Sequence, residues 1–492
     1  MSTSATRRIL ADFLASSKQK YLSSILSAPK LSRNEWTVVM GNESGDLDTI
    51  ACAIAYAYHQ THHLHKPTIP LIRIHRNDLK LRAENMYALA LAGVNEPENQ
   101  LLLLSDIPES KWPQREFALV DHNRLAPEFD WVDENEEKSR VVAVIDHHAD
   151  EGLYKNDDHV AKPRLIFPAG SCASLVASYI LDNNTNTEKD TIPPEISMLL
   201  LSAILIDTNL KPTSTGGKAT ELDFHAAAAL VRNAIFPDEI SKDDVAALLK
   251  TLPEINATAP FGQAMSPPVP SPSQDSESII QLLRSASPLS TLSETLTSKK
   301  FDVSHLSVRE LLKRDYKEYD YAVQLSSDPS DKTTIKGGLS TVPVGLTKWA
   351  GTGEEGNLDA LLAEGVNYMS ERGTSVLGVL TQFRKEKRKD GKRGKNKREM
   401  AWLIRTDAPS SSVADAVAQK IFTAFEESEE IRAGRHKKFE KYTKSSKSSP
   451  VPHARYDNLI IKVYKQGNAH ATRKATAPVL RRALEEPART GS

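Results

Sequence analysis

Four apolar runs within the first 210 residues are each followed by acidic residues, and this repeated arrangement constrains the fold more than any other feature. A continuous run of β-branched and aliphatic residues is typical of a strand buried in a parallel sheet. Polar groups that follow such strands face the crevice in which open α/β sheets bind ligands. The runs and the residues that follow them are 36–40 with Asn42, Asp46 and Asp48, 117–120 with Asp121, 141–145 with Asp146, His147 and His148, and 199–206 with Asp207. The last run is long enough for a helix, and the other three predict strands.

Short strands alternate with helix-length segments between residues 36 and 250, which predicts an α/β domain with a mainly parallel, doubly wound sheet. We expect helices at 49–59 and 83–92 with a strand at 68–74 between them. The predicted divisions of the chain are an N-terminal domain at 1–260, a Pro/Ser-rich disordered insertion at 261–300, a connecting helix and linker at 301–335, and a smaller α/β domain at 336–492.

The C-terminal domain contains a strongly basic segment. Residues 384–398 include ten Lys or Arg side chains, and we expect them to form a hairpin insertion between strands at 376–381 and 401–405. Further strands are expected at 341–345 and 459–464. The basic segment is open to two interpretations, a solvated loop or nuclear-import signal and a cationic strip that attracts a polyanion. It lacks interleaved aromatic residues for base stacking, which argues against nucleic acid as a partner.

Composition excludes several classes of protein. The chain has 492 residues with 63 basic and 64 acidic side chains, so no global charge favours nucleic acid or a membrane. Only two cysteines are present, Cys52 and Cys172, and their apolar surroundings predict buried thiols in a reducing compartment. We therefore expect a cytoplasmic protein without a membrane partner, and a monomer. A mitochondrial pool stays open because the Ser-rich N-terminus contains the basic, amphipathic segment 7–14.

The acidic residues after the runs have the chemistry of a metal site. Carboxylate oxygens are the ligands that Mg²⁺ and Mn²⁺ prefer, and clustered carboxylates repel one another unless cations lie between them. Two divalent ions would cancel the charges of Asp46, Asp48, Asp121 and Asp207, with Asp46 and Asp48 on either side of a tight turn. His147 can donate an imidazole nitrogen, and Asp146 is expected to orient it. The alternative for Asp121 or Asp207 alone is a helix N-cap.

These motifs resemble those of the DHH phosphoesterase superfamily. The resemblance rests on segment 42–48, Asp121-His122-Asn123, Asp146-His147-His148 and Asp207, and extends to Asp315-Tyr316-Lys317 and Thr472-Arg473-Lys474. Within the superfamily the sequence looks most like the fungal cytosolic exopolyphosphatases, which are related to family II inorganic pyrophosphatases and prune proteins. The resemblance implies an N-terminal catalytic DHH domain, a C-terminal DHHA2-type substrate-binding domain, and an active site in the cleft between them.

The resemblance also implies roles for individual residues. Asp46 and Asp121 would hold one metal ion, and Asp48, Asp121, His147 and Asp207 the other. The catalytic residues would be His148, Asp121 and Asp207, and the substrate would contact Asn42, His148, Lys317, Arg473 and Lys474. Asn42 replaces the His of the pyrophosphatases, which favours Mg²⁺ over Mn²⁺ and favours the exopolyphosphatase branch. His148 is retained, whereas prune proteins lose it.

The expected function is an exopolyphosphatase. It would release terminal orthophosphate from linear inorganic polyphosphate through attack of a water molecule activated by two metal ions. Three alternatives stay open: another phosphoanhydride hydrolase such as a pyrophosphatase or nucleoside tetraphosphatase, a prune-like phosphodiesterase, and a non-catalytic scaffold. The sequence does not indicate the preferred chain length or processivity.

Overall fold

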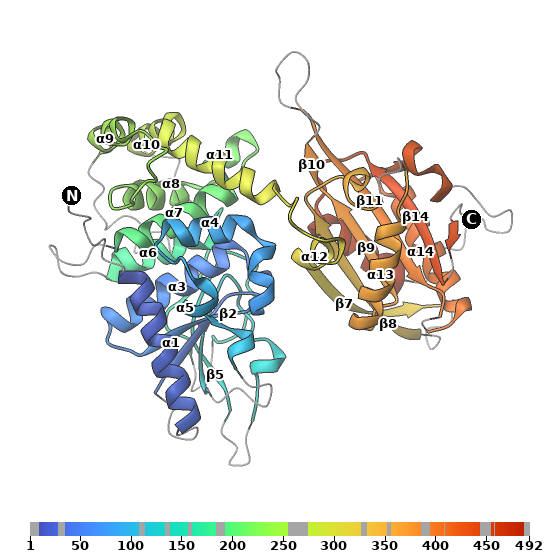
Figure 1. The fold of residues 1–492 in the computed structure, drawn as a ribbon, viewed down its shortest axis with the longest axis horizontal. Helices are drawn as coiled ribbons and strands as arrows, with labels where there is room; N and C mark the ends of the chain where they lie inside the picture. The colour runs from blue at the N-terminus through green and yellow to red at the C-terminus, as the bar shows by residue number, and fades with distance from the viewer. Residues whose placement is uncertain are drawn as a thin grey trace. The chain divides into compact units, whose positions relative to one another are not determined.

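A computed structural model gives the fold of the chain in two compact units, Met1–Lys300 and Phe301–Ser492 (Figure 1). The structure describes residues 9–27, 35–107, 114–132, 138–155, 160–183, 192–253, 274–325, 332–351, 356–384, 394–407, 409–442, 454–456 and 458–486.

The first unit is built on a six-stranded sheet in which every pairing is parallel. The strands in spatial order are β3 (Leu102–Leu103), β2 (Thr68–Ile72), β1 (Thr37–Met40), β4 (Glu116–Val120), β5 (Arg140–Asp146) and β6 (Arg164–Ile166). The chain builds outward from β1 to β3 and then returns to place β4 on the other side of β1. Ligands bind open α/β sheets at such a switch point, outside the carboxyl ends of the strands. The predicted parallel sheet is confirmed.

Alternate residues of these strands pack into two different cores, as the period of a strand requires. Val39, Ala118 and Ile145 face a core shared with α3 (Leu47–His62), α6 (Cys172–Asn183) and α7 (Pro194–Thr208). Val38, Leu119 and Val144 face the opposite core, to which α1 (Ile9–Ser27) contributes. Nearly every residue of α7 is buried, because this helix is apolar on all sides and lies inside the first core.

The remaining helices of the first unit are α4 (Ala83–Leu91), α5 (Pro97–Gln100), α8 (Glu221–Val231), α9 (Lys242–Thr251), α10 (Gln274–Ser285) and α11 (Ser287–Phe301), with 3₁₀ turns at Arg76–Leu81, Leu104–Asp106, Pro127–Phe129 and Thr213–Thr215. Of these helices, α8 to α11 gather at one end of the unit (Figure 1). The expected helix 49–59 lies inside α3, which is two residues longer at its start and three at its end, and the expected helix 83–92 agrees with α4 within one residue. The expected run 199–206 lies in the C-terminal half of α7.

The second unit is a mixed sheet with helices. Its main path is β12 (Ala433–Arg435), β14 (Leu459–Gln466), β11 (Asn396–Arg405), β9 (Val376–Thr381), β8 (Lys332–Val342) and β7 (Tyr316–Gln324), and the short strands β10 (Phe383–Arg384) and β13 (Ala454–Tyr456) join it. Its helices are α12 (Val308–Arg314), α13 (Asp359–Arg372), α14 (Ser411–Glu427) and α15 (Arg473–Glu485), with 3₁₀ turns at Leu346–Lys348 and Lys437–Tyr442. In its core the Trp402 ring stacks on Phe425, with centroids 4.8 Å apart.

The described residues of the segment 261–335 form more helix and strand than expected. The segment 261–300 was expected to be disordered, yet it contains α10 and α11, whose Leu289, Leu292 and Leu296 are buried. These leucines recur at helical spacing, and the Pro/Ser composition around them obscured that pattern. The run 267–273 itself lies outside the described residues. The expected linker 301–335 includes α12, the whole edge strand β7 and the start of β8.

The basic segment is flanked by paired strands. Phe383 pairs with Lys397 and Arg384 with Asn396 in an antiparallel arrangement, as expected for a hairpin. Residues 385–393 lie outside the described part of the chain. The strand expected at 341–345 is observed earlier in the chain. It is β8, which begins at Lys332 and ends at Val342, and the chain bends at Pro343.

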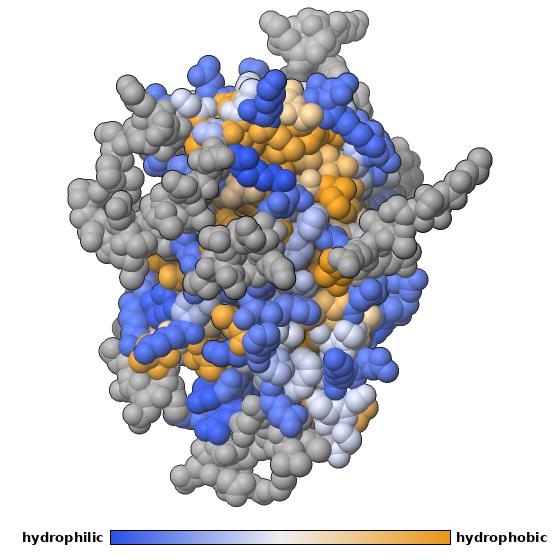
Figure 2. All heavy atoms as spheres, turned by 90° about the vertical axis from the view of Figure 1, so that its left-hand side faces the viewer, coloured by the Kyte–Doolittle hydropathy of each residue, from blue (hydrophilic) through white to orange (hydrophobic). Residues whose placement is uncertain are grey.

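One face of the first unit carries many polar side chains. Figure 2 shows hydrophilic side chains over much of one face, with apolar side chains gathered toward its upper part. The large apolar side chains with high exposure, such as Leu26, Val132 and Ile235, come from different segments. Among the described residues, no helix combines the length and apolar character that spanning a membrane requires.

Candidate metal centre

The predicted polar residues of the first unit converge at the switch point of its sheet. Asn42 follows β1, Asp121 follows β4, and Asp146 is the last residue of β5. These three strands are neighbours, so their carboxyl ends lie at one edge of the sheet. The convergence expected from the sequence is therefore present.

Asp121 is at the centre of the group. Its backbone has a φ of +60°, in the left-handed region that Asp tolerates better than most residues. One carboxylate oxygen, Oδ2, accepts hydrogen bonds from Thr49 Oγ1 at 2.6 Å and from Asn42 Nδ2 at 2.8 Å. The other, Oδ1, is buried and accepts no hydrogen bond from the described residues. A buried carboxylate oxygen without a donor is costly unless a cation faces it.

His147 presents a ring nitrogen to this oxygen. Its Nε2 lies 3.2 Å from Asp121 Oδ1, while its Nδ1 lies 3.0 Å from the carbonyl oxygen of Ala169. The carbonyl can only accept, so Nδ1 carries the proton and Nε2 is aimed at Asp121. Burial lowers the pKa of His147, but the carboxylates of Asp121 and Asp48 outweigh burial and raise the pKa to about 10. The imidazole is thus held in a strongly negative environment.

Asp146 orients His148 rather than His147, which corrects the expectation. Asp146 Oδ1 accepts from His148 Nδ1 at 2.8 Å and from the backbone N–H of His147 at 2.8 Å, and Asn123 donates to Oδ2. Burial raises the pKa of Asp146, but these hydrogen bonds outweigh it, so the pKa lies below its ordinary value. The His148 side chain is 43% exposed, and its contact with Asp146 is made through Nδ1.

Asp46 and Asp48 lie at the start of α3, not on either side of a tight turn. Asp46 is the N-cap of α3 and accepts from Thr49 N at 3.1 Å. Asp48 points to the N-terminus of α6, where the backbone N–H groups of Cys172 and Ala173 donate to it at 2.7 and 2.8 Å. Burial, and then the charges of Asp121 and Asp207, raise the pKa of Asp48 well above its ordinary value. Asp48 is therefore close to both.

Asp207 lies near the end of α7. Burial raises its pKa to about 6; Lys300 and Lys218 oppose this rise, while Asp46 and Asp121 add to it. Neither Asp121 nor Asp207 is a helix N-cap, so the capping alternative does not describe these two residues.

The donor set fits a divalent cation. Among the described residues, ligand atoms of Asp121, His147 and His148 lie within 4.8 Å of one another. Asp121 Oδ1 lacks a donor, and burial together with neighbouring acids raises the pKa values of Asp48 and Asp207, which a cation would oppose. Direct ligation by Asp46, Asp48 and Asp207 stays a prediction.

Several residues that support the site were not predicted from sequence. Arg82 donates to Ser44 O and Asn85 donates to Gly45 O, both at 2.8 Å, which fixes the loop that carries Asn42 and Asp46. Asn42 itself has both ends engaged, since its Oδ1 accepts from Ser44 N at 2.9 Å. Its predicted contact with substrate stays a prediction. These supporting groups contact backbone atoms across long sequence separations, so no short motif marks them.

In the second unit, the predicted substrate residues lie near the start of α15 and on β7. Arg473 is the first residue of α15, and its guanidinium contacts the Asp315 carboxylate and carbonyl oxygen, each at 2.8 Å. Lys474 N donates to the N-cap Thr472 Oγ1 at 3.3 Å, and Lys317 lies on β7 beside Leu339 of β8. Arg473 is thus already paired with an acid. Phosphate contacts of Lys317, Arg473 and Lys474 stay predictions.

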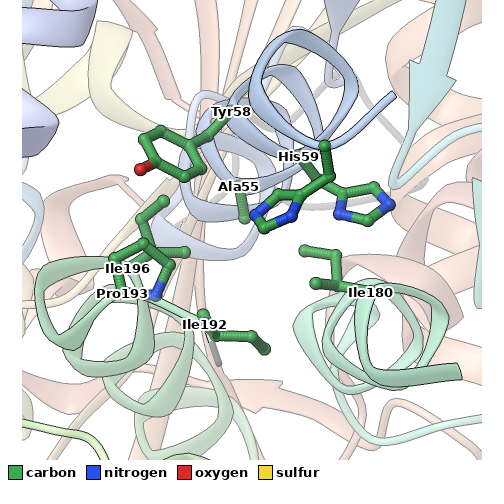
Figure 3. Close-up of a pocket in the computed structure, with 8 residues that line it drawn as sticks. Ala55, Tyr58, His59, Ile180, Ile192, Pro193 and Ile196 are labelled. Atoms are coloured by element: carbon green, nitrogen blue, oxygen red, sulfur yellow. The ribbon is translucent and has the colours of Figure 1, made fainter. Parts of the chain in front are cut away.

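A pocket elsewhere in the first unit has a different character. It is lined mainly by apolar side chains of α3, α6 and α7, with the His59 and His63 rings stacked at 5.2 Å between centroids (Figure 3). His59 lies about 17 Å along α3 from Asp48, at 1.5 Å per residue. None of the described residues that line it is acidic. This pocket is separate from the carboxylate cluster.

Comparison with known proteins identifies both domains. Residues 36–204 match the model of the DHH family, N-terminal domain, and residues 294–483 match the model of the DHHA2 domain. The chain therefore contains an N-terminal DHH domain followed by a DHHA2 domain.

Individual relatives carry two kinds of names. A Schizosaccharomyces pombe protein named "Putative exopolyphosphatase" is 35% identical over 219 residues, which are 42% of this chain and 54% of the relative. The Mus musculus protein "Exopolyphosphatase PRUNE1" is 32% identical over 217 residues, 42% of this chain and 43% of the relative. A manganese-dependent inorganic pyrophosphatase of Methanocaldococcus jannaschii is 29% identical over 201 residues, 40% of this chain and 55% of the relative. The chain thus spans about half the length of these relatives.

Proposed function

We propose that this protein is a metal-dependent phosphoanhydride hydrolase that releases terminal orthophosphate from linear inorganic polyphosphate. The observation that carries the proposal is the buried Oδ1 of Asp121, which faces His147 Nε2 at 3.2 Å and accepts no hydrogen bond from the described residues. Carboxylates and imidazole in this arrangement suit Mg²⁺ or Mn²⁺. The similarity to proteins named as exopolyphosphatases supports polyphosphate as the substrate.

The residues have separate tasks in this proposal. Asp46 and Asp121 would hold one divalent ion, and Asp48, Asp121, His147 and Asp207 a second. When bound, the ions would lower the pKa of water and neutralise phosphate charge. His148, held by Asp146 at 2.8 Å, would present Nε2 to the substrate and protonate or hydrogen-bond the leaving phosphate oxygen. Lys317, Arg473 and Lys474 would neutralise the charge of phosphate oxygens. Their contacts with the substrate, and an active site in a cleft between the domains, stay predictions.

A pyrophosphatase is the second candidate, because one of the relatives carries that name and its manganese dependence. The two functions use the same chemistry. They differ in how many phosphate groups of the substrate lie beyond the bond that is cleaved. Asn42 is the residue of the first motif on which we base the preference for polyphosphate and for Mg²⁺.

The test is release of orthophosphate by the purified protein in the presence of Mg²⁺ or Mn²⁺. Pyrophosphate, tripolyphosphate and a long polyphosphate are compared as substrates at equal concentration of chain ends. We expect tripolyphosphate and the long chain to be hydrolysed faster than pyrophosphate, with orthophosphate as the small product. Faster hydrolysis of pyrophosphate would favour the second candidate, and no release from any of them with either metal would contradict both.

A further inference from the structure

Asp223 is a fully buried carboxylate that receives five hydrogen bonds and contacts none of the predicted metal ligands through them. Oδ2 accepts from Gly170 N at 2.8 Å, Thr220 N at 2.7 Å and Thr220 Oγ1 at 2.8 Å. Oδ1 accepts from Ser174 Oγ at 2.6 Å and Ser171 N at 3.2 Å. All five donors are neutral backbone or hydroxyl groups. Because both oxygens of the carboxylate are occupied by these donors, we infer that Asp223 holds the donors in place.

The donors from 170–174 belong to the segment that orients two predicted metal ligands. Ala169 O accepts the hydrogen bond of His147 Nδ1 at 3.0 Å, and it directly precedes Gly170. Ser171 gives its backbone N–H to Asp223 and its hydroxyl to Asp48 Oδ1, the latter at 2.8 Å. Cys172 and Ala173, which follow it, also donate to Asp48. The segment 169–173 is therefore held between Asp223 on one side and His147 and Asp48 on the other.

Helix capping alone does not account for this geometry. Asp223 is at the third position of α8, and its contact with Thr220 N forms part of a capping box. A capping box needs only the Thr220 contacts, whereas three of the five donors come from residues about 50 positions earlier in the chain. Packing at Gly170 is equally tight: an added Cβ would lie 2.8 Å from Asp223 Oδ2 and 2.5 Å from Thr208 Cγ2.

We propose that Asp223 is a positioning residue for the metal centre. It anchors the segment 169–173 from behind, and the segment in turn fixes the ring of His147 through Ala169 O and the carboxylate of Asp48 through Ser171, Cys172 and Ala173. The inference rests on the proposed metal-dependent function. Groups that orient metal ligands typically change metal affinity about 10–100-fold when they are altered.

The experiment is a titration of the purified full-length chain with Mn²⁺, in which free Mn²⁺ is followed by electron paramagnetic resonance well below the melting temperature. The variant Asp223→Asn keeps the volume of the side chain but replaces one acceptor oxygen with a donor. We expect its Mn²⁺ dissociation constant to rise about 10–100-fold. The matched control is Ser241→Ala, which removes the N-cap hydroxyl of α9 and changes no hydrogen bond to Asp223 or to the segment 169–173. It should lower the melting temperature by a few degrees and leave Mn²⁺ affinity unchanged.

A milder variant keeps the test decisive if Asp223→Asn does not fold. Ser174→Ala removes one hydrogen bond to Asp223 and leaves α6 intact, and we expect a severalfold weaker Mn²⁺ affinity. If the wild-type chain binds Mn²⁺ and folded Asp223→Asn, or Ser174→Ala in its place, binds it equally well, the positioning role is wrong while the proposed function stands. A wild-type chain that binds neither Mn²⁺ nor Mg²⁺ would overturn both.

Discussion

Two regions of the molecule carry charged residues that the sequence marked as functional, and their charges are balanced differently. At the edge of the first sheet, Asp121, His147 and Asp146 come from neighbouring strands and meet in a buried cluster that retains an oxygen without a donor. At the start of α15, Arg473 is neutralised by Asp315 within its own unit. In the first region several buried carboxylates share one close imidazole, which suits a cation, whereas the one-to-one pair of the second region is equally consistent with a structural role.

The comparison shows why a strand-end motif is more informative than a basic helix start. The geometry of a parallel sheet forces residues after neighbouring strands to lie together, so several motifs predict one site. A basic pair at a helix start has no such constraint, and an acid 158 residues away in the chain can pair with it. Four experiments test whether the two regions differ in function as they do in structure.

The largest effect is expected for Asp121→Asn. This change removes the charge opposite His147 while keeping the volume, and loss of several kcal/mol of charge stabilisation corresponds to roughly a 10³-fold slower release of orthophosphate from tripolyphosphate. Asp150→Asn is the matched control, because Asp150 follows the triplet but its carboxylate pairs with Lys155 and Arg164. Turnover in Asp121→Asn within threefold of wild type would contradict the role of the cluster.

Metal ions are expected to stabilise the first unit. An ion that binds only the folded state stabilises it by about 2.7 kcal/mol when present at 100 times its dissociation constant. Differential scanning calorimetry of the chain with Mn²⁺ and with chelator should therefore show a higher transition temperature with Mn²⁺. The increase should disappear in Asp121→Asn and persist in Arg473→Ala. An equal increase in both variants would place the stabilising ion elsewhere.

Substitution of Arg473 tests the second region. A charge-assisted hydrogen bond contributes about 1.5–3 kcal/mol, so Arg473→Ala should lower kcat/KM for tripolyphosphate roughly 10–100-fold. The control is Arg481→Ala on the same helix, where an exposed pair with Glu485 at i,i+4 is removed. If both variants behave like the wild type, the Asp315–Arg473 pair is structural only.

The smallest effect is expected from the basic strands around 384–398. Arg384, Lys395 and Lys397 are exposed, and each exposed charge contributes at most about 1 kcal/mol. Changing all three to Gln should raise KM for a long polyphosphate severalfold at low salt and leave it unchanged at high salt, where charges are screened. KM for tripolyphosphate serves as the internal comparison. An effect that does not depend on salt would argue against an electrostatic strip.

The sequence predicted the parallel sheet and the edge at which its polar residues meet, because both depend on local patterns. Apolar runs located β1, β4 and β5, and the residues after them located the edge. It did not predict that Ala169 O holds His147 or that Asp146 holds His148, because these contacts depend on how the chain returns to the edge. The helices α10 and α11 were missed because composition outweighed the helical spacing of their leucines.

The distance in sequence between Asn42 and Asp223 has a consequence for synthesis of the protein. At roughly 5–20 residues per second, a ribosome needs about 10–45 s to extend the chain as far as Asp223. Asp121 and His147 are synthesised before Asp223. During that interval Asp223 does not yet hold the segment that orients His147. A nascent chain should therefore acquire its metal affinity late, after the whole first sheet has formed.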